Sequence, residues 1–273
     1  MIHYIGINNH ALSAKIAPAN GGMVAQITID GRDVLFFDES EAELMPILAG
    51  GSPVLFPFPS KTENGKYVID GREYHMPCHG LVKNGTFAVK HKTSDAVTLW
   101  CDSSNAQKEA NYPFDYLLEI EYKIAGNSLL TTAYVTNKSG KPMPHYLGWH
   151  PYFKASNKAA LKFEHSMTRH YDYVNREEEP AITELDLSMD LDYVLHTPEK
   201  KELTLYNKPD GYMARYLLDD AHNVVVVWTG KKGAVCIEPW CGLPDSINNG
   251  RFVRYVQPGD TAKYTVELEI EKL

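Results

Sequence analysis

The stretch Thr261-Ala262-Lys263-Tyr264-Thr265-Val266-Glu267-Leu268-Glu269-Ile270 decides the fold class. Apolar side chains occupy every second position from Tyr264 to Ile270, and polar side chains alternate with them. A period of two residues indicates a β-strand with one buried face and one solvated face, which is typical of antiparallel sheets. This stretch therefore predicts a strand of an antiparallel sheet.

Hairpin signals recur along the rest of the chain. Asp30-Gly31 and Asp70-Gly71 each join two runs of β-forming residues, and this dipeptide suits the two-residue turn of a hairpin. Longer hairpins are expected over residues 117–135 and 224–237, where β-forming runs flank segments that contain glycine. The pattern predicts an all-β protein.

Composition and organisation agree with one large domain. The chain has 273 residues, of which 44% are hydrophobic, so it can bury a large core. No Pro/Gly/Ser-rich linker and no repeat period divides it. The acidic stretch from Glu177 to Asp192 contains Pro180 and has no sustained periodicity, so we expect a loop with at most a helical turn there. We predict a single antiparallel β-domain over residues 1–273.

The charge distribution and the N-terminal residues exclude some classes of partner and indicate a cellular compartment. The formal net charge is −8 and the basic residues are scattered, which argues against nucleic acid or an anionic membrane as partner. The N-terminal residues 1–6 lack the features of a signal peptide, and no apolar run approaches the length of a membrane span. We expect a cytoplasmic protein whose cysteines are free thiols. These cysteines are Cys78, Cys101, Cys236 and Cys241.

Three segments far apart in the sequence carry residues suited to acid–base chemistry. His79 lies in Met76-Pro77-Cys78-His79-Gly80, where a proline and a glycine shape the backbone. His150 lies in Leu147-Gly148-Trp149-His150-Pro151-Tyr152-Phe153, among aromatic rings that offer flat faces to a sugar. Glu238 ends an apolar run and is followed by Pro239-Trp240. A carboxylate among apolar neighbours must be paired, hydrogen-bonded or shifted in pKa.

Each of these residues also has a purely structural interpretation. His79 could shape a turn, His150 could be a hydrogen-bonded core histidine, and Glu238 could face solvent at a strand end. His75 and His79 have the spacing of a helical metal pair, but Pro77 between them disfavours a helix. We therefore predict no metal site. Two histidines and one glutamate suit general acid–base catalysis without a covalent intermediate.

The ordered set of motifs resembles the aldose 1-epimerase (galactose mutarotase) family. The resemblance spans roughly residues 20 to 271 and is greatest for the shorter bacterial members, including those encoded with lactose-utilisation genes. The motifs that carry it are Gly50–Pro57, Tyr74–Gly80, Asn111–Phe114, Gly148–Phe153, Glu238–Trp240 and Gln257–Asp260.

This resemblance implies a large antiparallel β-sandwich and the interconversion of the α and β anomers of a free aldose. By position, Glu238 resembles the family's base, His150 its acid, and His79 the second histidine that hydrogen-bonds the sugar. We expect the sugar to contact Lys61 and the rings of Trp149, Tyr152 and Trp240. The reaction returns its protons, so no metal or organic cofactor is expected. The partner is a small-molecule sugar, and the protein is expected to be a monomer or a homodimer.

The sequence also departs from the family pattern. Lys61 stands where the family usually has an arginine, and Leu81 and Lys83 replace an aromatic residue and another arginine. The family's sugar-binding aspartate has two candidates here, Asp192 and Asp210. These departures leave two alternatives open. One is a non-catalytic carbohydrate-binding or sensor protein on the same fold. The other is a hexose-6-phosphate mutarotase with positive charge from Lys61 and Lys83.

Overall fold

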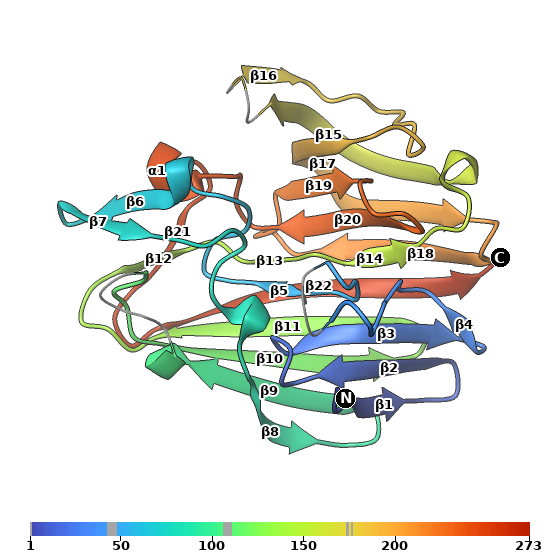
Figure 1. The fold of residues 1–273 in the computed structure, drawn as a ribbon, viewed down its shortest axis with the longest axis horizontal. Coiled ribbons are helices and arrows are strands. Elements are labelled where there is room, and N and C mark those ends of the chain that lie inside the picture. Colours follow the sequence, from blue (N-terminus) through green and yellow to red (C-terminus); the bar gives the residue numbers. More distant parts are fainter. Residues whose placement is uncertain (1, 43–47, 106–110, 173–174, 176) are drawn as a thin grey trace.

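Two antiparallel sheets account for most of the computed structural model, which describes residues 2–42, 48–105, 111–172, 175 and 177–273 (Figure 1). The larger sheet has 14 strands. Its main path runs in the order β5 (Val54–Leu55), β13 (Gly148–Trp149), β20 (Ala234–Trp240), β19 (Val224–Trp228), β17 (Asp192–Asn207), β18 (Tyr212–Leu218), β22 (Thr261–Lys272), β11 (Ser128–Asn137), β10 (Tyr116–Ala125), β9 (Ala96–Asp102) and β8 (Ala88–Lys92). Beside this path, β14 (Tyr152–Lys154) pairs with β20, and β15 (Lys162–Asp172) pairs with β17 and β16 (Glu177–Pro180).

The remaining strands form one four-stranded sheet and two small ladders. The four-stranded sheet consists of β1 (Ile5–Asn8), β2 (Leu12–Ala17), β3 (Met23–Ile29) and β4 (Arg32–Asp33). The ladders are β6 (Lys66–Ile69) with β7 (Arg72–His75), and β12 (Met143–His145) with β21 (Arg254–Val256). Short helices connect some strands: η1 (Glu63–Gly65), η2 (Val82–Asn84), η3 (Ser103–Asn105), η4 (Lys158–Ala160) and α1 (Ser246–Asn249). None of these helices in the described part of the chain is long and apolar enough to cross a membrane.

The hairpins follow the sequence signals. Asp30 and Gly31 have φ of 48° and 74°, and Asp70 and Gly71 have φ of 51° and 78°. Both turns therefore use the left-handed backbone that a tight hairpin requires. The longer hairpins are also present, as β10 with β11 and as β19 with β20.

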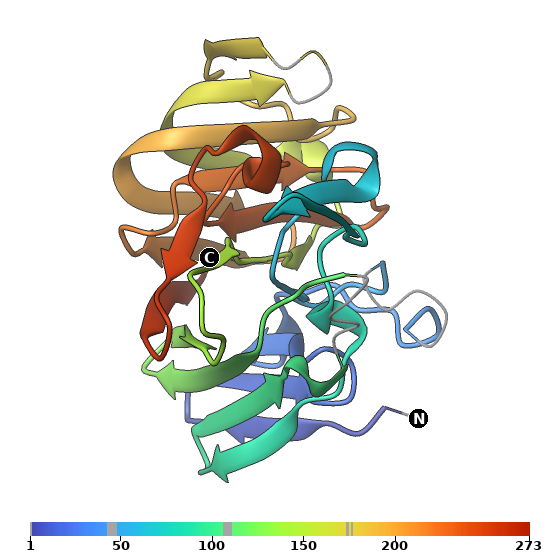
Figure 2. The ribbon, with the colours of Figure 1, turned by 90° about the vertical axis from the view of Figure 1, so that its left-hand side faces the viewer.

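The core lies between the two sheets. The alternating residues Tyr264, Val266, Leu268 and Ile270 of β22 are all buried, and they join one apolar cluster with Ile7 and other residues of the four-stranded sheet. This sheet lies over the β22–β11–β10–β9 part of the large sheet (Figures 1 and 2). The prediction of a large antiparallel β-sandwich is confirmed.

The two ends of the acidic stretch form strands that the sequence did not predict, whereas residues 181–191 form the expected loop with turns. Glu177–Pro180 forms β16, which pairs with β15, and Asp192 begins β17. β16 lies at the end of the β17–β15–β16 pairing path, with its side chains largely exposed. Charged residues and proline are tolerated in such an edge strand. With both faces polar, β16 has no hydrophobic period from which a strand could be predicted.

Candidate active site

β20 places Glu238 at the centre of the candidate site. Side chains of a strand alternate between its faces, so Cys236, Glu238 and Trp240 lie on the same face. In the register of the hairpin, Glu238 is opposite Val226 of β19. The Glu238 side chain is 1% exposed, which is rare for a carboxylate and is typical of a functional or paired group.

His150 reaches Glu238 because the two short strands around it flank the same neighbour. Gly148 of β13 is opposite Trp240, and Tyr152 of β14 is opposite Cys236, so His150 lies level with Glu238. The distance from His150 Nε2 to Glu238 Oε1 is 3.3 Å. The His150 N–H donates to the Pro53 carbonyl at 3.0 Å, which fixes the backbone.

The glycine before this histidine has a steric role. A Cβ atom at Gly148 would overlap the indole ring of Trp240, which lies across the ladder. Glycine at this position therefore lets Trp240 pack on the backbone beside His150.

His79 enters the site from a strained loop. His79 and Gly80 have φ of 64° and 78°, and a Cβ atom on Gly80 would overlap the Phe56 carbonyl. The His79 N–H donates to the Ser60 carbonyl at 2.7 Å, and the Ser60 N–H donates to His79 Nδ1 at 3.2 Å. Because Nδ1 accepts, the neutral ring carries its proton on Nε2 and can donate a hydrogen bond there.

These elements enclose a pocket of about 350 Å³, within the size range of small-molecule sites. The predicted residues that line it are Lys61, His79, His150, Tyr152, Glu238 and Trp240. The His79 ring lies 5.4 Å from the His150 ring and 6.1 Å from the Trp240 ring, between centroids. The His150 ring stacks on Tyr152 at 4.7 Å. Residues predicted from separate segments therefore share one pocket.

Comparison with known proteins places the chain in a family. A model of the aldose 1-epimerase family matches residues 4–269. The chain belongs to the aldose 1-epimerase family. Protein LacX (plasmid) of Lactococcus lactis subsp. lactis is 24% identical over 97% of this chain and 99% of its own length.

Solved structures share the fold of this aldose 1-epimerase family member. The Slr1438 protein from Synechocystis sp. PCC 6803 superimposes with a TM-score of 0.92 at 22% identity, covering 100% of this chain and 97% of that one. A galactose mutarotase related enzyme from Lactobacillus acidophilus has a TM-score of 0.83 at 20% identity, covering 99% of this chain and 98% of that one. At these identities the likeness concerns the fold.

Trp149 does not line the pocket, contrary to our expectation from the sequence. Its ring lies 5.2 Å from the ring of His222, between centroids, and it lines a different, interior cavity. Trp149 precedes His150 in extended backbone, so the two side chains point to opposite sides. The run of aromatic residues around His150 is therefore divided between the pocket and the core.

The structure separates the two candidates for a sugar-binding aspartate. Asp192, at the start of β17, lines the pocket. Asp210 lies elsewhere, where its Oδ2 accepts from the Ser156 N–H at 2.8 Å. The sequence could not decide between the two residues, because Asp192 reaches the pocket through the pairing of β17 with β19, which no local pattern shows.

Trp228 is a pocket residue that sequence reasoning missed. It lies opposite Cys236 in the β19–β20 hairpin, and its ring is 6.1 Å from that of His150. The hairpin itself was predicted, so counting back across its turn from Glu238 could have placed Val226 and Trp228 beside the site.

Burial shifts the pKa values of the catalytic candidates in opposite directions. Burial raises the pKa of Glu238 well above 4.5, the charge of Asp192 raises it further, and the Trp240 indole opposes this shift. Burial and nearby His79 lower the pKa of His150 well below 6.5. Burial and the charges of Lys83 and Lys61 lower the pKa of His79 to about 4. Both shifts favour the uncharged forms, so we expect the His150–Glu238 pair to hold a single proton, and His79, with a pKa of about 4, is neutral at neutral pH.

The His150–Glu238 pair retains unused hydrogen-bonding capacity. His150 Nδ1 and Glu238 Oε2 are buried without a hydrogen-bond partner among the described residues. Buried polar atoms are normally satisfied, so a pair in this state is expected where a ligand completes it.

Lys83 and Lys61, the two lysines of the pocket, differ in their availability to a ligand. Lys83 Nζ donates to the carbonyls of Cys78 at 2.6 Å and Gly80 at 3.0 Å, so it braces the His79 loop. Lys61 is exposed and lines the pocket, where a sugar hydroxyl or a more acidic group could reach it.

Proposed function

We propose that this protein is an aldose mutarotase that interconverts the α and β anomers of a free aldose. The observation that carries the proposal is the 3.3 Å approach of His150 Nε2 to Glu238 Oε1 in the pocket, beside a neutral His79. Family membership supports this reaction class. Perturbed pKa values in a cleft are typical of acid–base sites.

Ring opening requires one proton to leave the sugar and another to arrive. As a carboxylate, Glu238 takes the proton of the O1 hydroxyl, and the imidazolium form of His150 gives a proton to the ring oxygen. The C1–O5 bond breaks as the C1=O1 double bond forms. The Nε2–H of His79 hydrogen-bonds the sugar and helps to polarise that ring oxygen. Raised basicity makes a buried Glu238 effective once it is ionised.

Ring closure reverses these transfers after rotation about the C1–C2 bond. The O5 hydroxyl attacks the other face of C1, His150 recovers the proton from O5, and Glu238 returns a proton to O1. The enzyme ends in its starting protonation state. The short distance between the two groups also lets their shared proton redistribute between them without bulk solvent.

The pocket favours a neutral sugar over a phosphorylated one. Lys83 is engaged by two carbonyl groups, which leaves Lys61 as a single point charge, and Asp192 adds a negative charge to the pocket wall. Phosphate sites usually offer several donors or a bidentate arginine. We therefore place Lys61 and Asp192 as partners of sugar hydroxyls.

Anomer exchange measured by NMR, or polarimetry on freshly dissolved α-glucose and α-galactose, tests the proposal. Wild type should accelerate exchange, whereas His150→Asn and Glu238→Gln should each reduce kcat about 10²–10⁴-fold. Asp192→Asn should raise KM, and Asp210→Asn is its matched control because that carboxylate lies outside the pocket.

The outcomes separate the alternatives. Exchange at the rate of buffer for a panel of aldoses, together with sugar binding by calorimetry, would replace the proposal with a sugar-binding or sensor role. Faster turnover of glucose 6-phosphate than of glucose would replace it with a sugar-phosphate mutarotase.

A further inference from the structure

A thiol lies within reach of the proposed catalytic pair. Cys236 is two residues before Glu238 on β20 and shares its face of the strand. The ligand atoms of His150, Cys236 and Glu238 all lie within 4.8 Å of one another, and all three residues are buried. This is a set of one imidazole nitrogen, one thiol sulfur and one carboxylate oxygen.

The arrangement is close to that of a tetrahedral zinc site with three protein ligands. Bond lengths of about 2.0–2.2 Å from Zn²⁺ to nitrogen and oxygen imply a nitrogen–oxygen separation of roughly 3.3 Å. His150 Nε2 and Glu238 Oε1 already stand 3.3 Å apart. A zinc–sulfur bond of about 2.3 Å places the sulfur roughly 3.6 Å from the other two ligand atoms, so the Cys236 sulfur has to approach them by about 1.2 Å at most.

The pocket provides an entry path and a fourth ligand position. His150 and Glu238 line the pocket, whereas Cys236 lies behind them against Tyr152. An ion that entered along the sugar's route would keep one position open to water. Zinc sites with three protein ligands and an open position have this form.

We propose that His150, Cys236 and Glu238 form a zinc-binding site whose occupation blocks the sugar site. The binding claim stands on geometry alone, and the inhibition claim rests on the proposed mutarotase function. The ion occupies the base and the acid together, so neither can exchange a proton with substrate.

The charges of the buried site balance in both states. Coordination displaces the thiol proton of Cys236 and the proton shared by His150 and Glu238. The products are a thiolate, a carboxylate, a neutral imidazole and one Zn²⁺ ion, so two protons leave and the net charge is unchanged. A bound cation deprotonates a coordinating thiol outright, which offsets the burial that otherwise keeps Cys236 protonated.

Titration of the whole protein with Co²⁺ as a spectroscopic probe for zinc tests the binding claim. Wild type should develop a thiolate-to-cobalt charge-transfer band with about one equivalent bound, and added Zn²⁺ should remove it. Cys236→Ala should lose the band and weaken binding more than about 100-fold, since even residues that only orient ligands are worth about 10–100-fold. Cys241→Ala is the matched control, because Cys241 is equally buried but outside the cluster.

Two further measurements keep the test independent of variant folding and of catalysis. X-ray absorption of zinc-loaded wild type should show one sulfur at about 2.3 Å from the metal. In the anomer-exchange assay, Zn²⁺ should inhibit wild type competitively with sugar and should inhibit Cys236→Ala far less. The proposal is overturned if wild type shows no sulfur ligand, or if the cobalt band persists in Cys236→Ala. An absence of mutarotation with intact cobalt binding would overturn the proposed function and the inhibition claim that rests on it, and would leave the metal-binding claim standing.

Discussion

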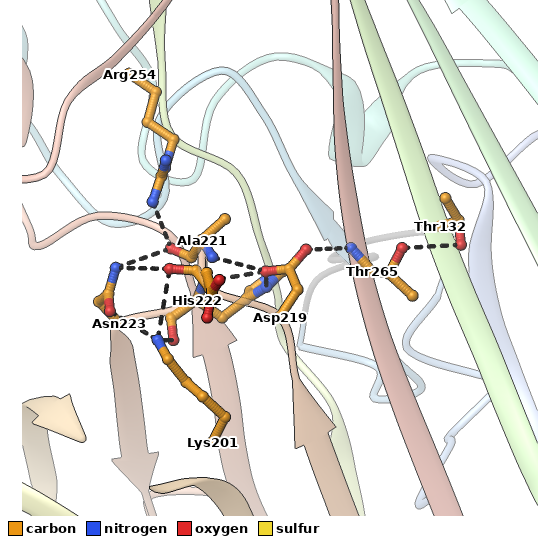
Figure 3. Close-up of polar contacts among 9 residues, drawn as sticks. Thr132, Lys201, Asp219, Ala221, His222, Asn223, Arg254 and Thr265 are labelled. Carbon is orange, nitrogen blue, oxygen red and sulfur yellow. Dashed lines mark hydrogen bonds and ion pairs between the residues drawn. The ribbon is translucent and has the colours of Figure 1, made fainter. Parts of the chain in front are cut away.

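His150 and Glu238 approach to 3.3 Å at the pocket, whereas His222 and Asp219 meet at 2.7 Å between Nδ1 and Oδ1. Both pairs are imidazole and carboxylate, and both histidines are buried. Asp219 Oδ1 also accepts from the Ala221 N–H at 2.9 Å, and Oδ2 accepts from the Thr265 N–H at 2.6 Å (Figure 3). Glu238 Oε2 has no hydrogen-bond partner among the described residues.

The pKa values of the two carboxyl groups record this difference. Burial pushes the pKa of Asp219 up, but the hydrogen bond and charge of His222 and the two backbone N–H groups bring it to about 2. Burial raises the pKa of Glu238, and no comparable set of donors reverses the shift. The difference lies in the carboxylates, since His222 Nε2, like His150 Nδ1, has no hydrogen-bond partner among the described residues. A carboxylate with both oxygens hydrogen-bonded stabilises the fold, and one with an unsatisfied oxygen is available for chemistry. Hydrogen bonding, more than burial, separates the two roles.

Removing each carboxylate should separate activity from stability most clearly. Glu238→Gln should lower kcat about 10²–10⁴-fold, because the base is lost, while the free energy of unfolding at pH 7 stays the same or rises. Anomer-exchange NMR and urea unfolding measure the two effects. Activity within tenfold of wild type would remove Glu238 from the mechanism.

Asp219→Ala should have the opposite profile. It leaves the Ala221 and Thr265 N–H groups and His222 without their acceptor, so we expect about 3 kcal/mol less stability by urea unfolding. We expect kcat to stay within an order of magnitude, because His222 contacts Trp149 and not the pocket. Retained stability would mean that this network is not the structural counterpart we infer.

The two pairs should give opposite pH dependences of stability. The folded pKa of Asp219 is depressed from 3.8 to about 2, so its contribution of about 2 kcal/mol is present above pH 4 and is lost as the pH falls toward 2. Asp219→Asn should lack this loss.

The His150–Glu238 pair should change the free energy of unfolding at higher pH than Asp219 does. Between pH 4.5 and 6.5 it holds one proton in both the folded and the unfolded state, so its stability contribution is constant. Above pH 6.5 the unfolded chain releases that proton, and we expect the folded pair to keep it because burial raises the pKa of Glu238, so stability should fall as the pH rises. Urea unfolding across pH should show this fall in wild type and not in Glu238→Gln. Parallel curves for the two proteins above pH 6.5 would contradict the shared proton.

The indole rings beside the two pairs should give the smallest effects. Trp240→Phe should raise KM several-fold, equivalent to about 1 kcal/mol of lost ring contact with the sugar. Trp149→Phe should leave KM unchanged and lower the free energy of unfolding by about 1–2 kcal/mol, because its ring packs on His222. A KM effect from Trp149 would restore our sequence-based expectation that this residue contacts the sugar.

Local patterns predicted most of the fold. The alternation in β22 and the Asp-Gly turns depend on neighbours in sequence, so the strands, the hairpins and the antiparallel sandwich could be predicted without coordinates. β16 could not, because an edge strand with two polar faces has no hydrophobic period. The predicted pocket residues came from motifs, and their functional roles stay predictions.

The sequence by itself singled out the candidates for chemistry: His79, His150 and Glu238, each in a motif with glycine or proline that shapes its own backbone. The tertiary structure alone decided how they meet. The flanking of β20 by β13 and β14 sets the His150–Glu238 distance and directs Trp149 into the core. It also places Cys236 beside the pair. The pairing of β17 with β19 brings Asp192 but not Asp210 to the pocket. Strand register between distant segments sets these distances, and a pattern confined to one segment does not encode it.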